Sequence, residues 1–226
     1  RARCVVNATG VWVDDLRAKA CRVGRDPLPE RMVSPSQGVH VVVDREFMPG
    51  DHALLVPKTR DGRVLFAVPW LGKLILGTTD TPRQDLPLEP APFERELDFI
   101  LREAAKYLRR APTRADLLST WVGLRPLVKP SDDDGQGATK SISREHTVLV
   151  APSGLVTVTG GKWTTYRAMA EDVLARCTQA GVLLPRGRSR TAELPLVGAP
   201  AGTTARATGL SQPPGPRLYG AEAELL

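Results

Sequence analysis

The sequence predicts a mixed α/β (α+β) fold, in which strand–turn–helix segments near both ends enclose an antiparallel sheet. Near the start, the β-rich run 4–6 is followed by apolar residues at helical spacing from Trp12 to Ala20. The same order of elements returns between 146 and 178, and it is typical of α/β domains. Between these segments, short apolar runs with period-two spacing are separated by turn residues, as in an antiparallel sheet.

The middle of the chain contains the clearest strand and turn signals. Asp61-Gly62 and Leu71-Gly72 stand where tight hairpin turns are needed, because glycine accepts the positive φ of such turns. The apolar runs that we expect to form the strands before residue 80 lie at 39–43, 53–56, 64–68 and 74–76.

Helix signals follow this sheet and recur near residue 170. Pro90 and Pro92 end the sheet, and apolar residues at helical spacing then predict a helix at about 92–109. A strand at 117–127 and a polar loop at 131–137 come next, followed by strands at 146–150 and 155–159 and a helix at about 162–178. From 184 the composition is that of a linker, and 219–226 has the pattern of a beginning helix. The four predicted segments are 1–25 and 131–183 of one α/β domain, 26–130 as a sheet domain, and 184–226 as a linker leading to a further helical domain.

Composition excludes several classes of function. The 226 residues are 42% hydrophobic and 25% charged, which is typical of a soluble globular protein, and no apolar run is long enough for a membrane span. Three widely spaced cysteines predict neither a metal site nor a disulfide framework, so we expect reduced thiols and a cytoplasmic protein. The net charge of +6 could attract nucleic acid, but the arginines are scattered and aromatic residues make up only 5%. We therefore expect no nucleic-acid partner.

The strongest candidate site follows the predicted strand 155–159. Gly160 and Gly161 would let the backbone approach a ligand closely, and the helix start after them would present N–H groups and a partial positive charge. Lys162 adds a charge, and Thr164 and Thr165 add hydroxyls. This combination suits an anion or a ring carbonyl that becomes anionic on reduction; close packing of glycines and a threonine helix cap are the alternative explanation.

Other candidates are weaker alone. The turn Asn7-Ala8-Thr9-Gly10 ends a strand, although turn geometry explains it equally well. Arg125 and Arg144 lie in or beside apolar strands, where a guanidinium needs a carboxylate or a phosphate. His40 lies within a valine-rich strand, either as a structural residue or as a general base.

Five motifs follow one another along the chain, at 5–12 (VVNATGVW), 36–40 (SQGVH), 68–80 (VPWLGKLILGTTD), 122–127 (VGLRPL) and 158–167 (VTGGKWTTYR). In this order and at about this spacing, they resemble the FAD-dependent glycerol-3-phosphate dehydrogenases over about residues 1–180. A weaker likeness is found at 217–222 (RLYGAE).

The resemblance implies a Rossmann-like FAD domain interrupted by a substrate-binding sheet of the amino-acid-oxidase type, with a C-terminal helical domain. It also implies oxidation of sn-glycerol 3-phosphate to dihydroxyacetone phosphate, with electrons passed through FAD to membrane quinone. Partners would then be glycerol 3-phosphate, quinone and the inner face of the cytoplasmic membrane, where the protein would be peripheral, and we consider a homodimer.

Residue roles follow from matching the motifs. Asn7, Ala8, Thr9 and Gly10 match a turn beside the cofactor, and Gly160, Gly161, Lys162, Thr164 and Thr165 match the segment over the flavin ring. Arg125, Arg144 and Lys162 match cations that hold the substrate, and His40 matches a histidine of the substrate sheet, so that Lys162, Arg125 and His40 are the catalytic candidates. Gln37 departs from the family, which often has Lys there.

The family's opening G-x-G-x-x-G motif is not found in this sequence. We therefore expect the chain to be an internal piece of such an enzyme that is inactive alone. A glycerol-3-phosphate oxidase that uses O₂, and a non-catalytic basic module that binds anions, are the alternatives. No metal site is expected.

Overall fold

A computed structural model describes residues 2–24, 27–59, 62–129, 145–199 and 209–225. By contacts between residues, the chain divides into two units. Unit 1 comprises Arg1–Gln37, Thr81–Glu89 and Leu124–Glu193, and unit 2 comprises Gly38–Asp80, Pro90–Gly123 and Leu194–Leu226. The predicted segment 26–130 is thus shared between the two units.

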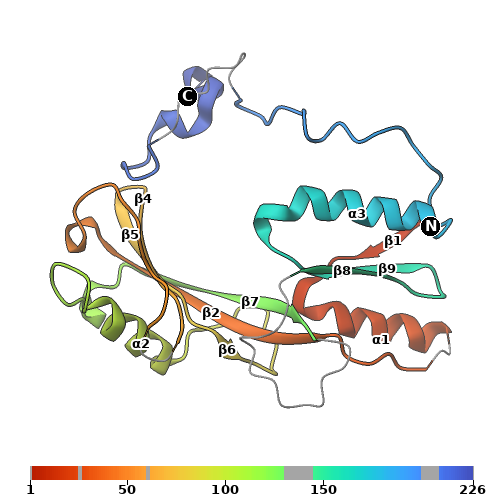
Figure 1. Ribbon diagram of the computed structural model, residues 1–226, viewed down its shortest axis with the longest axis horizontal. Helices are drawn as coiled ribbons and strands as arrows, with labels where there is room; N and C mark the ends of the chain where they lie inside the picture. The colour runs from red at the N-terminus through yellow and green to blue at the C-terminus, as the bar shows by residue number, and fades with distance from the viewer. Residues whose placement is uncertain (1, 25–26, 60–61, 130–144, 200–208, 226) are drawn as a thin grey trace. The chain divides into compact units, whose positions relative to one another are not determined.

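Unit 1 is a small three-layer α/β structure (Figure 1). Its sheet has the order β1-β9-β8, in which β1 (Val5–Asn7) runs parallel to β9 (Leu155–Gly160) and β8 (His146–Val150) runs antiparallel to β9. The helix α1 (Val13–Gly24) lies against one face of this sheet, and α3 (Tyr166–Gln179) lies against the other. The described parts of the predicted segments 1–25 and 131–183 thus pack together.

Unit 2 is built on the antiparallel sheet that the period-two pattern predicts. The sheet has the order β3-β4-β5-β2-β6, and β7 pairs with β2. The strands β2 and β7 belong to both units, and β6 belongs to unit 1. The bounds of these strands are β2 Val33–Asp44, β3 Leu54–Val56, β4 Leu65–Trp70, β5 Lys73–Gly77, β6 Thr81–Pro82 and β7 Ser119–Val128.

The turn between β4 and β5 confirms one predicted hairpin. Trp70 faces Lys73 in the register, and the two residues between them, Leu71 and Gly72, have φ of 48° and 79°. Positive φ at both positions is the requirement of the tight turn whose twist matches that of the strands. For the other predicted hairpin, Gly62 has positive φ, while Asp61 lies outside the described residues.

The core of unit 2 lies between the sheet and α2 (Glu94–Ala104). Val39, Val41 and Val43 are fully buried, whereas the residues between them are half-buried, as expected of a strand with one face on a core. Ile100 of α2 is fully buried in the same cluster. This helix is shorter than the predicted 92–109 because the chain continues in turns after Ala104.

Two predicted helix ends are wrong. The segment Trp163–Thr165 is a 3₁₀ turn, so α3 begins at Tyr166 rather than near Lys162. The predicted helix at 219–226 is part of a stretch of 3₁₀ turns, Pro216–Leu225, broken at Gly220.

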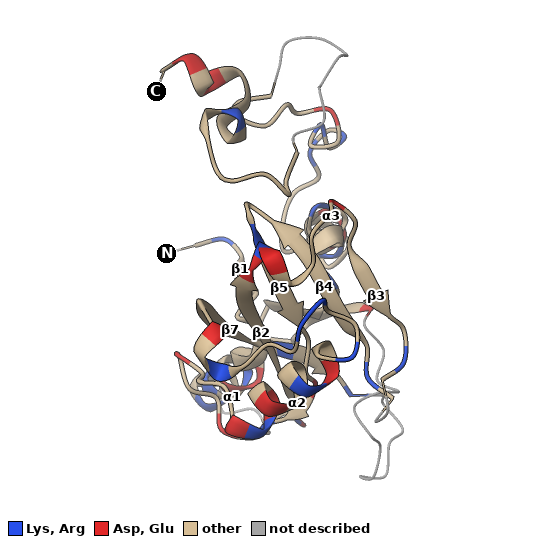
Figure 2. Cartoon of the chain, turned by 90° about the vertical axis from the view of Figure 1, so that its left-hand side faces the viewer, with Lys and Arg blue, Asp and Glu red and all other residues tan. Residues whose placement is uncertain are grey.

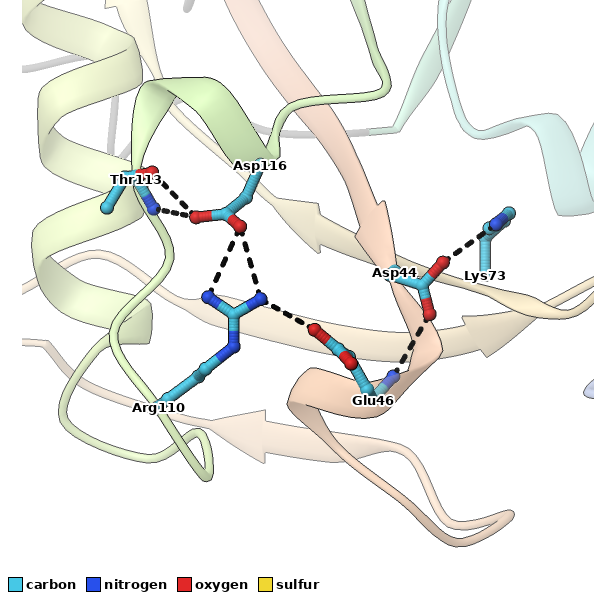
Figure 3. Close-up of polar contacts among 6 residues, drawn as sticks. All are labelled: Asp44, Glu46, Lys73, Arg110, Thr113 and Asp116. Carbon is cyan, nitrogen blue, oxygen red and sulfur yellow. Dashed lines mark hydrogen bonds and ion pairs between the residues drawn. The ribbon is translucent and has the colours of Figure 1, made fainter.

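Acidic and basic residues are interspersed along α2 rather than forming a patch of one sign (Figure 2). Beside that helix, Arg110 donates to Glu46 at 2.6 Å and to Asp116 at 3.2 Å (Figure 3). Hydrogen bonds from the hydroxyl and the backbone N–H of Thr113 lower the pKa of Asp116, and Arg110 contributes less. These exposed groups are therefore paired with one another and do not form a site for an external anion.

Candidate functional site

The turn after β9 is the best-defined candidate site in unit 1. Gly160 and Gly161 have φ of 77° and 76°, which side-chain-bearing residues rarely adopt. A Cβ on Gly160 would lie 2.5 Å from the carbonyl oxygen of Glu145, and one on Gly161 would lie 2.5 Å from Met169 Sδ. Backbone conformation therefore favours glycine at both positions. Packing against the backbone of Glu145 also excludes a side chain at Gly160, whereas a Cβ on Gly161 would displace the flexible Met169 side chain.

The second predicted segment, Asn7 to Gly10, follows the carboxyl end of β1. Because Asn7 pairs with Thr157 in parallel register, this turn and the Gly160 turn follow the same end of adjacent strands. Ligands of open α/β sheets bind outside the carboxyl ends of the strands. The two predicted cofactor segments thus meet the geometric condition for one site.

The buried side chain of Asn7 stabilises this turn by hydrogen bonds. It is fully buried, and its amide donates to the carbonyl of Val13 at 2.9 Å and to Thr157 Oγ1 at 3.4 Å. Its carbonyl oxygen accepts from Thr9 Oγ1 at 2.8 Å. Asn7 therefore holds the turn to the start of α1, while Ala8 and Thr9 are exposed.

The segment after the glycines differs from the prediction in one chemical respect. The backbone N–H and hydroxyl of Thr165 both donate to the carbonyl of Lys162, at 3.0 and 2.9 Å, and the Tyr166 N–H bonds to Trp163. The Thr165 hydroxyl thus has a structural partner. Because the α-helix begins only at Tyr166, its dipole acts from farther along the chain than we predicted.

Lys162 and Thr164 are exposed, and Lys162 has no ion pair among the described residues. Its ammonium is thus available to a ligand at this turn.

The predicted arginines are only partly described. Arg125 lies half-buried in β7 and has a polar interaction, whereas Arg144 lies outside the described residues. The strand β7 reaches the glycine turn at Val128, whose Cγ2 would lie 2.8 Å from a Cβ on Gly160. Arg125 is three residues earlier, or roughly 10 Å along the strand.

His40 belongs to unit 2, where two contacts define its position. Its ring stacks on Trp121 with centroids 5.2 Å apart and planes at 11°. On β5, the paired residue is Gly77, and a Cβ there would collide with the imidazole. The ring is therefore held in one orientation by a small residue and an aromatic face.

Gln37, where the family often has lysine, is fully buried. Its side-chain oxygen accepts from Arg83, which also makes paired bonds of 2.9 and 2.8 Å to Asp85. A guanidinium from the residue after β6 thus lies next to the position of the missing lysine. No spacing pattern predicts this contact, because Gln37 and Arg83 are 46 residues apart.

Three further contacts escaped the sequence-based analysis because each joins residues far apart in the chain. In unit 2, buried Glu96 accepts from Thr79 Oγ1 at 3.0 Å. In unit 1, His146 Nε2 lies 3.0 Å from Asp172 Oδ2. The thiols of Cys4 and Cys177 are 3.8 Å apart, and burial raises the pKa of Cys177.

A cavity of about 530 Å³ in unit 1 is not the candidate site. It is lined by residues such as Arg3, Leu16 and Ser153, near the amino ends of β1 and β9. The glycine turn lies at the carboxyl ends. Within the described ranges, no three metal-ligating side chains come together, and no helix is long and apolar enough to cross a membrane.

Comparisons with known proteins agree with this geometry. The chain is 44% identical over 197 residues to a mitochondrial glycerol-3-phosphate dehydrogenase of Arabidopsis thaliana, covering 87% of this chain and 30% of the relative. It is 44% identical over 200 residues to the mitochondrial glycerol-3-phosphate dehydrogenase of Bos taurus, covering 88% and 26%. The chain thus spans less than a third of the length of these relatives.

A solved structure and a family profile give the same result. The glycerol-3-phosphate dehydrogenase of Bacillus halodurans, complexed with FAD, superposes with a TM-score of 0.67 at 33% identity, covering 88% of this chain and 36% of that one. Residues 1–173 match the family described as FAD dependent oxidoreductase. Since that match covers more than half of the residues, the chain belongs to the FAD dependent oxidoreductase family.

Proposed function

We propose that this chain is part of a flavoenzyme that oxidises the C2 hydroxyl of sn-glycerol 3-phosphate to dihydroxyacetone phosphate. The observation that carries the proposal is 44% identity, over 87–88% of the chain, to proteins named glycerol-3-phosphate dehydrogenase. The turn at the carboxyl end of β9 supports it, because its exposed lysine and backbone suit an electron-rich ligand.

The residues at this turn fit FAD by the chemistry of their donors. When bound, FAD would supply the hydride acceptor and would carry negative charge once reduced. Lys162 would stabilise that charge with its ammonium, and the backbone from Gly161 to Thr164 would add N–H donors. Asn7 would keep the neighbouring turn in place through its internal hydrogen bonds.

Substrate binding is assigned to cations. Arg125 and Arg144 would hold the phosphate, since a guanidinium grips phosphate oxygens with two parallel hydrogen bonds. His40 is the candidate for accepting the hydroxyl proton, because its ring is held rigidly by Trp121 and Gly77.

The proposal also includes the electron acceptor and the cellular location. We propose membrane quinone as the acceptor and peripheral association with the inner face of the cytoplasmic membrane. A homodimer is included because a second copy would double the contacts with the membrane. None of these partners is needed for the hydride transfer itself.

The test uses the full-length protein. We expect it to purify with about one FAD per chain and to lose its visible flavin absorbance when glycerol 3-phosphate is added without oxygen. Electrons should then pass to a soluble quinone faster than to O₂. Faster hydrogen peroxide release would instead identify an oxidase. Absence of flavin, together with salt-dependent binding to heparin, would replace the enzyme with an anion-binding module.

A further inference from the structure

A histidine–aspartate contact joins β8 to α3 beside the turn at Gly160 and Gly161. His146 begins β8 and faces Gly160 in the β8–β9 register. Its Nε2 lies 3.0 Å from Asp172 Oδ2 on α3. An ionised carboxylate only accepts hydrogen bonds, so Nε2 donates. The contact therefore bridges β8 directly to α3.

His146 also packs directly against the Gly160–Gly161 turn. A Cβ on Gly160 would lie 3.4 Å from His146 Cα, and one on Gly161 would lie 3.1 Å from His146 Cβ. Met169, one helical turn before Asp172, closes the other side, with its Sδ 2.5 Å from the same position on Gly161. The turn is thus confined between the histidine backbone and α3.

The rest of α3 offers few other anchors to β8. Among the described residues, the helix buries only Val173 and Cys177, while Asp172 has a second, looser contact at 3.8 Å with Arg176 on the helix itself. Because both side chains are partly exposed, the His146–Asp172 contact contributes only a modest free energy of stabilisation. Its position is more important than its strength. It joins the first half of α3, which begins at Tyr166 after the 3₁₀ turn Trp163–Thr165, to β8.

We propose that His146 and Asp172 are positioning residues that hold the Gly160–Gly161 turn and thereby place Lys162 at the flavin. This assignment of a role toward flavin rests on the proposed function. Neither residue would touch the reacting atoms. Loss of their contact would let the start of α3 move away from β8, and the lysine ammonium would lose its fixed position.

The experiment compares three variants of the full-length holoenzyme. Asp172→Ala removes the contact, whereas Asp172→Asn keeps an acceptor oxygen for Nε2. Glu171→Ala is the matched control, because Glu171 is equally exposed and pairs with Arg167 on the same helix at 2.6 Å without reaching β8. The first measurement is hydrogen exchange at the backbone amides of Thr165 and Tyr166, which donate to the carbonyls of Lys162 and Trp163. This measurement needs no cofactor.

We expect Asp172→Ala to speed this exchange about tenfold, equivalent to loss of ~1.4 kcal/mol, as for one hydrogen bond to a charged group. Asp172→Asn and Glu171→Ala should stay within about twofold of the wild type. Equal exchange in Asp172→Ala and Glu171→Ala would overturn the proposal, whether or not the protein binds FAD. Absence of FAD from the wild type would overturn only the proposed function and the flavin part of this role.

A double-mutant cycle tests the connection with Lys162. Asp172→Ala should lower kcat about tenfold and lower the reduction potential of the bound flavin. In the Lys162→Met background, the same substitution should change neither quantity further, because no ammonium remains to be placed. Additive effects would mean that the pair only stabilises the fold and would overturn the positioning role.

Discussion

Replacing Glu96 by Ala should destabilise unit 2 far more than replacing an exposed charged residue on the same helix. Glu96 is 1% exposed, and its carboxyl group accepts from Thr79 Oγ1 at 3.0 Å and from the Phe93 N–H at 2.9 Å. Thr79 Oγ1 in turn accepts from the Val39 N–H at 3.0 Å. One buried side chain thus connects the start of α2 to β2 and to the segment after β5.

The size of the effect follows from counting these bonds. Glu96→Ala removes the acceptor of one buried and one half-buried donor, each worth about 1–1.5 kcal/mol, so the free energy of unfolding should fall by about 2–3 kcal/mol. Glu96→Gln should cost only about 1 kcal/mol. Its oxygen can still accept from Phe93, and its amide can donate to Thr79, whose hydroxyl oxygen has two lone pairs.

The assay is urea unfolding followed by circular dichroism, with Glu94→Ala as the control. Glu94 lies on the same helix and pairs with Arg114 at 2.9 Å, but its side chain is 84% exposed. Such surface pairs contribute under about 1 kcal/mol. Equal losses for Glu96→Ala and Glu94→Ala, or a Gln variant as unstable as the Ala variant, would refute the argument.

Three further predictions concern Gly161, Lys162 and Cys177. Gly161→Ala and Gly181→Ala should each lower the free energy of unfolding by about 1 kcal/mol through backbone strain, since φ is 76° and 70°. Only Gly161→Ala adds a collision with Met169, so equal unfolding midpoints for the two variants would contradict the packing at the turn. Lys162→Met should retain FAD and lower kcat about 100-fold, whereas Lys58→Met, at an exposed site, should leave kcat unchanged. Because burial raises the pKa of Cys177, the folded state holds this proton longer, so stability should fall as pH rises above the ordinary thiol pKa. Urea unfolding at pH 7 and pH 9.5 checks this, and Cys177→Ala should show a smaller fall.

Much of the fold follows from local rules that the sequence obeys. Alternating valines at 39, 41 and 43 can bury one face only as a strand, and the structure places all three in the core. Leu71-Gly72 specifies its turn because the two strands demand positive φ at both positions. Pro90 and Pro92 lie just before α2, as expected of residues that precede a helix, whereas the last strand before them already ends at Pro82. These signals depend on neighbours in the chain and are therefore visible without coordinates.

The predicted start of α3 was wrong because local hydrogen bonds, which apolar spacing does not reveal, form a 3₁₀ turn there. Two consecutive glycines with positive φ lead into Lys162, whose carbonyl takes the N–H and hydroxyl of Thr165. This bonding tightens Trp163–Thr165 into a 3₁₀ turn. Apolar spacing cannot distinguish an α-turn from such a turn, because the side-chain positions differ little over three residues.

The supporting contacts of the site were missed because they depend on tertiary packing. His146 and Asp172 are 26 residues apart, and each alone resembles an ordinary surface residue. Glu96 lies among charged residues, so its burial appears only once α2 packs on the sheet. Sequence patterns identify residues that approach a ligand, whereas the residues that hold them in place are defined by the fold.

The glycine turn shows why the two explanations offered for it are compatible. A Cβ on Gly160 or Gly161 would collide with protein atoms, and both residues have positive φ, so a side chain is disfavoured there without any ligand. Failure of a glycine variant therefore cannot demonstrate cofactor contact. Lys162 differs, because it is exposed and forms no ion pair within the described chain, so its replacement should leave the packing unchanged. A loss of turnover at unchanged stability in Lys162→Met would thus report the chemistry of the ligand, and it separates that chemistry from the structural need for glycine.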